Sequence, residues 1–370
     1  MMARAHSSAP ARVVVVEDSV VQRAHLVSVL EADGDIVVVG EATSAIEAIE
    51  LVGQLRHDVV TLDLNIPDGG GQHALEQIMA NTPTPVLVLS STVRNDTSAP
   101  AVEALVGGAL IAVPKPLRWT PALETELRRS VRTIRNVPVI RHPRGRLRNR
   151  TTTSGAPASG PAAIRPPATT QSSDTGKAVE SSVVAIAAST GGPPALATVL
   201  AGLRGLRAPV LIVQHIHPDF VQGFVDWMAR IAPLPVVLAQ NGQALRNGYI
   251  HIGPGGTHLR VGAGRKIELA TRPHTVHRPS ADELFASVAM HVRQDGIGVL
   301  LTGMGDDGAK GLAAMHQRGA RTIAQDAETS AVYGMPRAAK ELGAVDEQLP
   351  LTEIAAAIMR AAARRSAELS

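Results

Sequence analysis

The stretch VVAIAASTGGPPAL, residues 183–196, contains a pattern from which the local secondary structure can be predicted. A run of apolar and small residues predicts a buried strand, and the chain then turns at Ser189 and two glycines. Pro193 and Pro194 follow, and prolines fit the first turn of a helix because no N–H is required there. The segment therefore predicts a strand, a tight turn and a helix, with Ser189 at the turn.

Three roles fit a serine in this position. It can be a nucleophile on a strand-to-helix turn, although the G-x-S-x-G pattern of such turns is absent. The N–H groups at the start of the helix can bind a phosphate. The hydroxyl can also cap the helix. This segment alone leaves the three roles open.

Length and composition place the segment in a larger α/β protein. A chain of 370 residues is long for one domain and comfortable for two. Hydrophobic residues make up 45% of the chain but aromatic residues only 2%, so the core has to be built from aliphatic side chains. Such a core suits parallel sheets, whose buried strands are continuous runs of Val, Ile and Leu.

The same composition argues against several classes of protein. The absence of cysteine excludes disulfides and thiolate metal sites and fits a cytoplasmic protein. No apolar run approaches the roughly 18 residues that a membrane span needs, and the N-terminus lacks the pattern of a signal peptide. We therefore expect a cytoplasmic protein without membrane insertion.

Residues 137–181 divide the chain. Pro, Ser, Thr, Gly, Ala and Arg dominate this stretch and no apolar period appears, which is typical of a flexible linker. It includes RHPRGRLRNR, residues 141–150, whose five arginines could form a nucleic-acid-binding arm or a solvated linker edge. No aromatic residues are interleaved with them, so we favour the linker and expect no nucleic-acid partner. One domain would then span residues 1–136 and another residues 182–370.

On each side of this linker, short apolar runs alternate with helical stretches, which predicts two α/β domains with doubly wound parallel sheets. In the first domain we expect strands over residues 13–16, 58–65, 85–92 and 109–116. The polar residues at their ends are Glu17 and Asp18, Asp63, Ser90 and Lys115. Sites form at the carboxyl ends of such strands. Clustered carboxylates suit Mg²⁺, a lysine can neutralise one of them, and a carboxylate can accept a phosphoryl group.

These motifs, VVEDS, TLDLNIPDGG, VLSS and PKP, resemble the receiver domain of two-component response regulators over residues 10–136. The resemblance implies that Asp63 is the phosphoacceptor and that Glu17 and Asp18 hold Mg²⁺ with it. It also implies that Ser90 hydrogen-bonds the phosphoryl group, that Lys115 pairs with it, and that a histidine kinase is the phosphodonor. Glu17 stands where many members of the family have Asp.

The second domain places three residue types of catalytic interest at strand ends. Ser189 follows the first strand, His215 follows the apolar run that begins at residue 208, and a strand beginning at residue 296 ends in a glycine-rich turn with Asp306 and Asp307. A nucleophilic serine needs a base and an orienting acid, and a triad is defined by geometry and role, whatever the order along the chain. Their joint placement favours a Ser-His-Asp triad.

The second domain resembles the catalytic domain of the chemotaxis response-regulator protein-glutamate methylesterase (CheB) family, and the receiver–linker–esterase order extends the resemblance over nearly the whole chain. The motifs are ASTGG, QHIHPDF, YIHIGPGGTHL, HRPSADELFASVA, LLTGMGDDGAKGL and AVYGMPRAA. The resemblance implies a methylesterase-type, Rossmann-like domain that hydrolyses glutamate γ-methyl esters on methyl-accepting chemoreceptors, without a cofactor for this step, and that also deamidates glutamine. The kinase would be the chemotaxis histidine kinase.

The resemblance also assigns roles within the site. Ser189 would be the nucleophile, His215 the general base and Asp307, which precedes Gly308, the orienting acid. Thr190 and the Gly303–Gly305 turn, with Met304, would form the oxyanion-binding edge or rim. We expect the remaining histidines of these motifs to belong to the framework or the rim: His251, His258 and His277. His217, two residues after His215, makes the choice of base less secure.

Two other classes of output domain are compatible with parts of the sequence. STGGPP and GPGG could bind phosphate or a nucleotide, but the lysine of a P-loop and the G-x-G-x-x-G order are missing. A DNA-binding output would need a basic recognition helix, and none stands out. Release of methanol from a methyl-ester-labelled receptor distinguishes the esterase from both.

Overall fold

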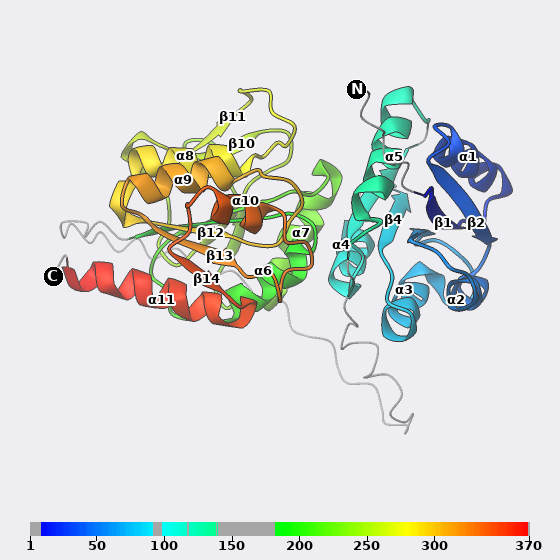
Figure 1. Cartoon of the computed structure of the whole chain (residues 1–370). Coiled ribbons are helices and arrows are strands. Elements are labelled where there is room, and N and C mark those ends of the chain that lie inside the picture. Colours follow the sequence, from blue (N-terminus) through cyan, green and yellow to red (C-terminus); the bar gives the residue numbers. More distant parts are fainter. Residues whose placement is uncertain (1–8, 92–97, 117, 138, 140–181, 369–370) are drawn as a thin grey trace, which may run out of the picture.

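The computed structural model describes residues 9–91, 98–116, 118–137, 139 and 182–368. They form two α/β domains that lie side by side (Figure 1). The predicted linker, residues 137–181, falls almost wholly outside the described residues.

The N-terminal domain is a five-stranded parallel sheet in the order β2-β1-β3-β4-β5. Its strands are β1 (Ala11–Val16), β2 (Ile36–Ala42), β3 (Val59–Asp63), β4 (Val86–Ser91) and β5 (Ile111–Lys115). Apolar side chains of α1 (Val20–Glu31) and α5 (Pro121–Ile134) pack on one face of the sheet. The other face is covered by α2 (Ala45–Gln54), α3 (Gly70–Asn81) and α4 (Ser98–Gly107).

The C-terminal domain is a seven-stranded parallel sheet in the order β14-β13-β12-β6-β7-β9-β8. Its strands are β6 (Val183–Ala188), β7 (Val210–Gln214), β8 (Val236–Leu238), β9 (Ile250–Ile252), β12 (Gly296–Leu300), β13 (Arg321–Gln325) and β14 (Glu347–Leu349). An antiparallel hairpin of β10 (His258–Gly262) and β11 (Lys266–Ala270) is added to it, and the sequence pattern did not predict this hairpin.

Helices cover both faces of this second sheet. One face carries α6 (Gly192–Ala201), α7 (Val221–Ile231) and α11 (Leu351–Glu368). The other carries α8 (Ala281–His291), α9 (Ala309–Gln317), α10 (Met335–Glu341) and the hairpin. Short 3-10 turns lie at η2 (Pro218–Phe220), η3 (Ala263–Arg265) and η4 (Arg293–Asp295). The prediction of two doubly wound α/β domains is confirmed.

The central strands of both domains are buried on both faces, which explains their continuous aliphatic sequences. Some of the helices begin where a short polar side chain bonds a free N–H group of the first turn. Ser44 accepts from Glu47 N at the start of α2, and Ser280 accepts from Glu283 N at the start of α8. In α6, Pro193 lies in the first turn and is buried, as predicted.

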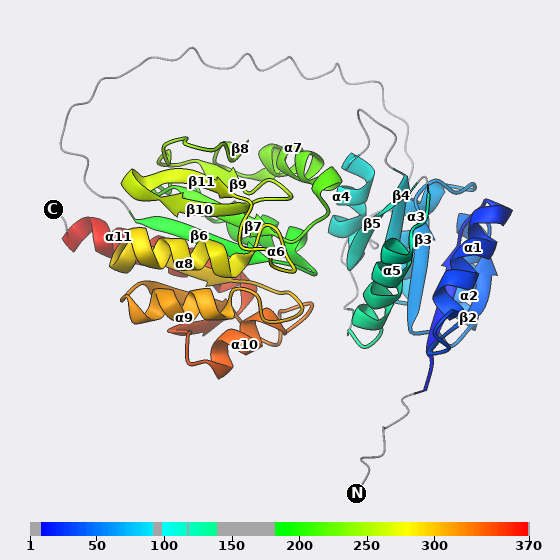
Figure 2. The ribbon, with the colours of Figure 1, turned by 90° about the horizontal axis from the view of Figure 1, so that it is seen from above.

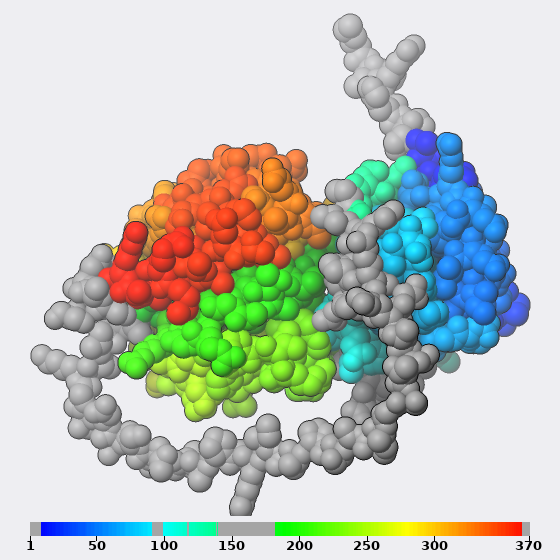
Figure 3. Space-filling model, turned by 90° about the horizontal axis from the view of Figure 1, so that it is seen from below, coloured from blue at the N-terminus to red at the C-terminus, as the bar shows by residue number. Residues whose placement is uncertain are grey.

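The two domains meet along α4. This helix packs against α6, η2 and α7 of the C-terminal domain, and their apolar side chains belong to one continuous buried cluster (Figure 2). In the space-filling view the N-terminal domain, blue to cyan, and the C-terminal domain, green to red, form two adjoining bodies (Figure 3). Within the described residues, none of the helices has the length and apolar character needed to cross a membrane.

Candidate active site and acidic site

The acidic site lies where three strands of the N-terminal sheet end. Glu17 follows β1, Asp63 ends β3 and Lys115 ends β5. Lys115 Nζ lies 2.5 Å from Glu17 Oε2 and 2.6 Å from Asp63 Oδ2. Asp18 is exposed beside them, and a carboxylate oxygen from each of the three acids lies within 4.8 Å of the others. The predicted metal-binding acids are therefore brought together.

The charges at this site are incompletely balanced. Burial raises the pKa of Glu17, and the neighbouring charge of Asp63 adds to this, although Lys115 opposes both. Burial disfavours the charge on Lys115, but its hydrogen bonds with Asp63 and Glu17 prevail and raise its pKa. Three carboxylate oxygens within 4.8 Å of one another, with Asp18 exposed, fit a Mg²⁺ ion, which keeps part of its hydration shell.

Ser90 lies at the same edge of the sheet. It is buried near the end of β4, one residue after Leu89, which pairs with Asp63 in the sheet register. On the other side, Ser90 pairs with Pro114, the residue before Lys115. The sheet register thus places Ser90 between the strand ends that carry Asp63 and Lys115.

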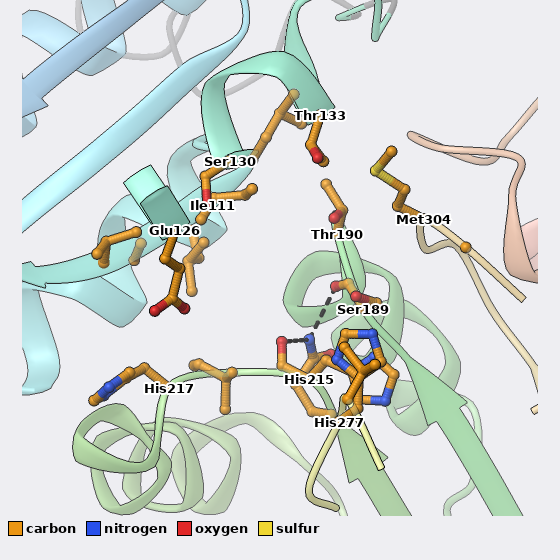
Figure 4. Close-up of a pocket in the computed structure, with 18 of the residues that line it drawn as sticks. Ile111, Glu126, Ser130, Thr133, Ser189, Thr190, His215, His217, His277 and Met304 are labelled. Carbon is orange, nitrogen blue, oxygen red and sulfur yellow. Dashed lines mark hydrogen bonds between the residues drawn. The ribbon is translucent and has the colours of Figure 1, made fainter. Parts of the chain in front are cut away.

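The turn after β6 is fixed by hydrogen bonds to its backbone. Ser189 N donates to Thr302 O at 3.0 Å, and Gly192 N donates to Ser189 O at 2.8 Å. Gln214 Nε2 also donates to Ser189 O, at 2.9 Å, and to His215 O, at 3.0 Å (Figure 4). Gln214 therefore ties the turn of Ser189 to the end of the neighbouring strand β7.

The turn that follows β12 packs directly against Ser189. A Cβ atom on Gly303 would lie 2.7 Å from Ser189 Cβ and 2.2 Å from Met335 Sδ, so only glycine fits there. Thr302 Oγ1 donates to Thr190 O at 3.0 Å, and Thr302 N donates to Gln325 Oε1 at 2.8 Å. These bonds fix the two turns relative to each other.

His215 faces a carboxylate that is itself rigidly held. His215 Nε2 lies 2.9 Å from Asp307 Oδ2. Asp307 also accepts hydrogen bonds from Ser280 Oγ at 2.7 Å and from the N–H groups of Ala281, at 2.7 Å, and Asp282, at 3.1 Å. Burial opposes the charge of Asp307, but His215 and the donors at the start of α8 hold its pKa well below the usual range.

His215 and Ser189 line the same cavity. Although His215 Nε2 lies 2.9 Å from Asp307 Oδ2, neither ring nitrogen of His215 has a hydrogen-bond partner of good geometry among the described residues. Asp306, the alternative acid, is exposed and is not a lining residue of that cavity. The structure therefore brings His215 and Asp307 into contact and places Ser189 at the same cavity as His215.

A second imidazole covers His215. The ring of His277 stacks on that of His215, with centroids 4.1 Å apart and planes at 9°. Desolvation, together with the neighbouring His215, lowers the pKa of His277 to about 4, so its ring is neutral at neutral pH. His258 is buried in the framework, where its ring nitrogens form hydrogen bonds with Pro273 O and Ser280 N. His251 is buried in β9.

The cavity at Ser189 has a volume of about 550 Å³ and lies between the two domains (Figure 4). The N-terminal domain lines it with residues of α4, β5 and α5, which include Ile111, Glu126, Ser130 and Thr133. Thr190 and Met304 line its other side. In the described part of the chain, the backbone N–H groups of Thr190 and Met304 have no hydrogen-bond acceptor. Gly303 N, in contrast, donates to Val332 O at 3.0 Å. Gly303 is therefore not an available oxyanion donor.

Sequence reasoning did not identify the residues that position this site. Gln214 and Thr302 act on backbone groups, which no side-chain motif reveals. Ser280 had a detectable signal, because Ser280 and Glu283 have the spacing of a capping box at a helix start. That signal predicts a helix N-terminus and gives no indication that Asp307 lies on it.

Comparisons with known proteins identify the family of each domain. The family model described as response regulator receiver domain matches residues 13–125, and the model described as CheB methylesterase matches residues 184–358. The protein-glutamate methylesterase/protein-glutamine glutaminase 3 of Paramagnetospirillum magneticum is 40% identical over 94% of this chain and 95% of its own. An enzyme of the same name, number 2, from Anaeromyxobacter dehalogenans is 41% identical over 96% of this chain and 98% of its own.

Among solved structures, the CheB methylesterase catalytic domain of Thermotoga maritima is 32% identical and covers 49% of this chain and 98% of its own, with a TM-score of 0.48. Two domain models and relatives that match nearly end to end define the class of protein as a response regulator whose output domain is a carboxylic-ester hydrolase. The chain belongs to the protein-glutamate methylesterase/protein-glutamine glutaminase family.

Proposed function

We propose that this protein hydrolyses glutamate γ-methyl esters on methyl-accepting chemoreceptors, and that phosphorylation of its receiver domain regulates this activity in chemotaxis adaptation. The observation that carries the proposal is the position of His215. Its Nε2 lies 2.9 Å from a carboxylate oxygen of Asp307, which is held by donors at the start of α8, and His215 shares a cavity with Ser189. A serine, an imidazole and a fixed carboxylate in this arrangement can perform acyl transfer.

In the first half of the reaction, Ser189 Oγ attacks the γ-carbonyl carbon of the ester while His215 Nδ1 takes the hydroxyl proton. The tetrahedral intermediate collapses, the C–O bond to the methoxy group breaks, and His215 returns the proton so that methanol leaves. In the second half, His215 takes a proton from water and the resulting hydroxide attacks the acyl-enzyme. The bond from the acyl carbon to Ser189 Oγ then breaks, His215 returns its proton to that oxygen, and the carboxylic acid formed loses its proton to water. Asp307 keeps the imidazole oriented and stabilises its charged form.

The negative oxygen of the two tetrahedral intermediates needs hydrogen-bond donors. The N–H groups of Thr190 and Met304 are the donors we propose, because both residues line the cavity with Ser189 and their N–H groups have no protein acceptor in the described residues. A glutamine side chain presents the same carbonyl, with ammonia as the leaving group. The same residues therefore account for a glutaminase activity, and no cofactor takes part in either reaction.

We propose Asp63 as the phosphoacceptor of the receiver domain. A chemotaxis histidine kinase would be the phosphodonor. Mg²⁺ held by Glu17, Asp18 and Asp63 would neutralise the charge of the incoming phosphoryl group. Ser90 would hydrogen-bond that group and Lys115 would pair with it, since Ser90 lies near the end of β4, the neighbour of β3, and Lys115 Nζ lies 2.6 Å from Asp63 Oδ2. A substrate on the cytoplasmic part of the receptors would require the protein to act in the cytoplasm, which is the location we propose.

The test uses receptor membranes that carry radioactive methyl groups on their glutamates. The full chain should release labelled methanol, and a small acyl-phosphate donor with Mg²⁺ should accelerate the release. Asp63→Asn should abolish both the labelling of the protein by the donor and the acceleration. A release that is absent from the wild type contradicts the esterase proposal, and labelling that persists in Asp63→Asn, seen by mass spectrometry, places the acceptor elsewhere.

A further inference from the structure

The wall that the C-terminal domain contributes to the active-site cavity contains cationic and neutral side chains and, among the described lining residues, no carboxylate. Its ionisable lining residues are His215, His217, His277 and Arg278. Asp307 lies behind His215 and is outside the lining, and the exposed Asp219 lies 3.6 Å from His217. Arg278 is therefore the permanent positive charge of this wall.

Arg278 belongs to an exposed loop, residues 271–278, that follows the β10–β11 hairpin. Its guanidinium contacts the ring of His274, with Nη1 and Nδ1 3.4 Å apart, and pairs with no acidic group in the described part of the chain. Val276 also lines the cavity and is 84% exposed. This loop thus carries an unpaired cation and an apolar side chain at the mouth of the active site.

The receiver domain presents a carboxylate to the same cavity. Glu126, Arg129, Ser130 and Thr133 lie on one face of α5 by their spacing and line the cavity. The Glu126 side chain points into the space between the domains, on the side where His217 lies (Figure 4). The structure therefore already contains a helix that offers a glutamate to the wall of the C-terminal domain.

We propose that Arg278, at the end of the loop formed by residues 271–278, binds an acidic segment of the substrate protein next to the scissile glutamyl ester. The proposal rests on the proposed function. A methyl ester carries no charge, so the reacting group itself cannot attract the enzyme over a distance. Hydrolysis converts each ester into a glutamate, and a segment with more than one such position carries carboxylates beside the remaining ester. A single unpaired arginine at the cavity mouth suits these neighbours.

The size of the effect follows from the exposure of the loop. An exposed arginine–carboxylate pair contributes up to about 1 kcal/mol, which is about fivefold in affinity. Such a pair mainly affects association and depends on ionic strength. The preference for acidic neighbours should therefore appear in KM, leave kcat nearly equal, and weaken as salt is added.

The experiment compares two synthetic peptides that contain one glutamate γ-methyl ester. The residues three and four positions away on both sides are Glu in one peptide and Gln in the other. Methanol release is measured with the full chain, a small acyl-phosphate donor and Mg²⁺, at low and high salt. We expect wild type to prefer the Glu-flanked peptide about fivefold in KM. Arg278→Gln should remove the preference and Arg278→Lys should restore part of it.

Arg272→Gln is the matched control, because Arg272 lies in the same exposed loop but does not line the cavity. It should keep the preference of wild type. A preference that survives in Arg278→Gln, or an equal loss on both peptides, overturns the docking role. A wild type that hydrolyses both peptides without preference also overturns it. A wild type that hydrolyses neither peptide contradicts the proposed esterase function, which is a different result.

Discussion

A buried carboxylate in the N-terminal domain and a partly buried one in the C-terminal domain, each following a strand, have opposite electrostatic surroundings. Glu17 follows β1, and burial and the charge of Asp63 raise its pKa. Asp307 follows β12, and although burial disfavours its charge, His215 and the donors at the start of α8 lower its pKa. Both groups lie near a positive or polarisable partner. They differ in how many hydrogen-bond donors satisfy the charge.

The difference indicates what each carboxylate can do. Glu17 shares the one ammonium group of Lys115 with Asp63, so the three acids together hold more negative charge than their surroundings neutralise. Such a cluster can accept a divalent cation. Asp307 is bonded on several sides and has a fixed charge and position. A carboxylate held in this way can orient an imidazole during a reaction but has little capacity left for a metal.

The largest effects are expected for substitutions in the proposed catalytic triad, to which Asp307 belongs. Ser189→Ala and His215→Ala should each lower methanol release by several orders of magnitude. Asp307→Asn should lower it on the order of 10³–10⁴, because the asparagine cannot hold the imidazole in the required tautomer or stabilise its charge. The measurement is single-turnover methanol release from methyl-labelled receptor membranes.

Asp306→Asn is the matched control for that substitution, because Asp306 is adjacent in sequence, exposed and outside the cavity lining. It should cost far less than Asp307→Asn. If Asp306→Asn were the more damaging change, the assignment of the orienting acid would be wrong.

The next effect concerns how the two sites communicate. The cavity at Ser189 is lined on one side by α4, β5 and α5, and β5 ends at Lys115 in the acidic site. A fragment that begins near residue 179 lacks this cover and should be about 10- to 100-fold more active than the unphosphorylated full chain, because a shift from mostly closed to mostly open takes a few kcal/mol. Phosphorylation should raise the full chain toward this level and leave the fragment unchanged.

The attachment of the receiver to the esterase domain through a tether keeps its effective concentration high, so a weak interface is enough to cover the site. Rates of methanol release for the fragment and for both states of the full chain test this. If the fragment is folded, as checked by circular dichroism, and yet is no faster than the unphosphorylated full chain, activation by direct contact remains as the explanation.

The sequence was sufficient for the strands that carry the proposed site residues, but it did not predict β2, β8, β9, β13 or β14. Continuous aliphatic runs predict buried parallel strands, and the carboxyl ends of such strands have to meet at one edge. Glu17, Asp63 and Lys115 are brought into contact as expected. The sequence was insufficient for contacts that depend on the packing of distant loops. The stacking of His277 on His215 joins two loops far apart in the chain, and no local pattern contains that information.

A smaller effect is expected at the support of Asp307. Ser280→Ala removes one of the donors to this carboxylate and should lower kcat about tenfold, since a hydrogen bond to a charged group contributes about 1.5–3 kcal/mol. Its KM should change little. Ser287→Ala is a control on the same helix, because Ser287 is also buried. Its hydroxyl accepts from Val261 N and donates to Leu284 O, and these bonds do not involve Asp307. An equal loss of kcat in both variants would mean that only the stability of α8 matters.

The smallest expected effect is on stability. It tests whether folding raises the pKa of Glu17 and lowers that of Asp307. The pKa of Glu17 is higher in the folded protein than its ordinary value of 4.5, so the folded state binds this proton more tightly. The ionised carboxylate therefore destabilises the fold, with no effect at pH well below 4.5 and its full effect above the folded pKa. Glu17→Gln should stabilise the metal-free protein at pH 7, and the gain should vanish in acid. Asp307→Asn should instead destabilise it, because the folded state there favours the charged form. Thermal unfolding at several pH values measures both.

Added Mg²⁺ should stabilise wild type and not Glu17→Gln, so the order of the two reverses. A Glu17→Gln variant that is less stable than wild type at pH 7 without Mg²⁺ would show that Lys115 neutralises the cluster fully, and that the acidic site is not poised for a cation.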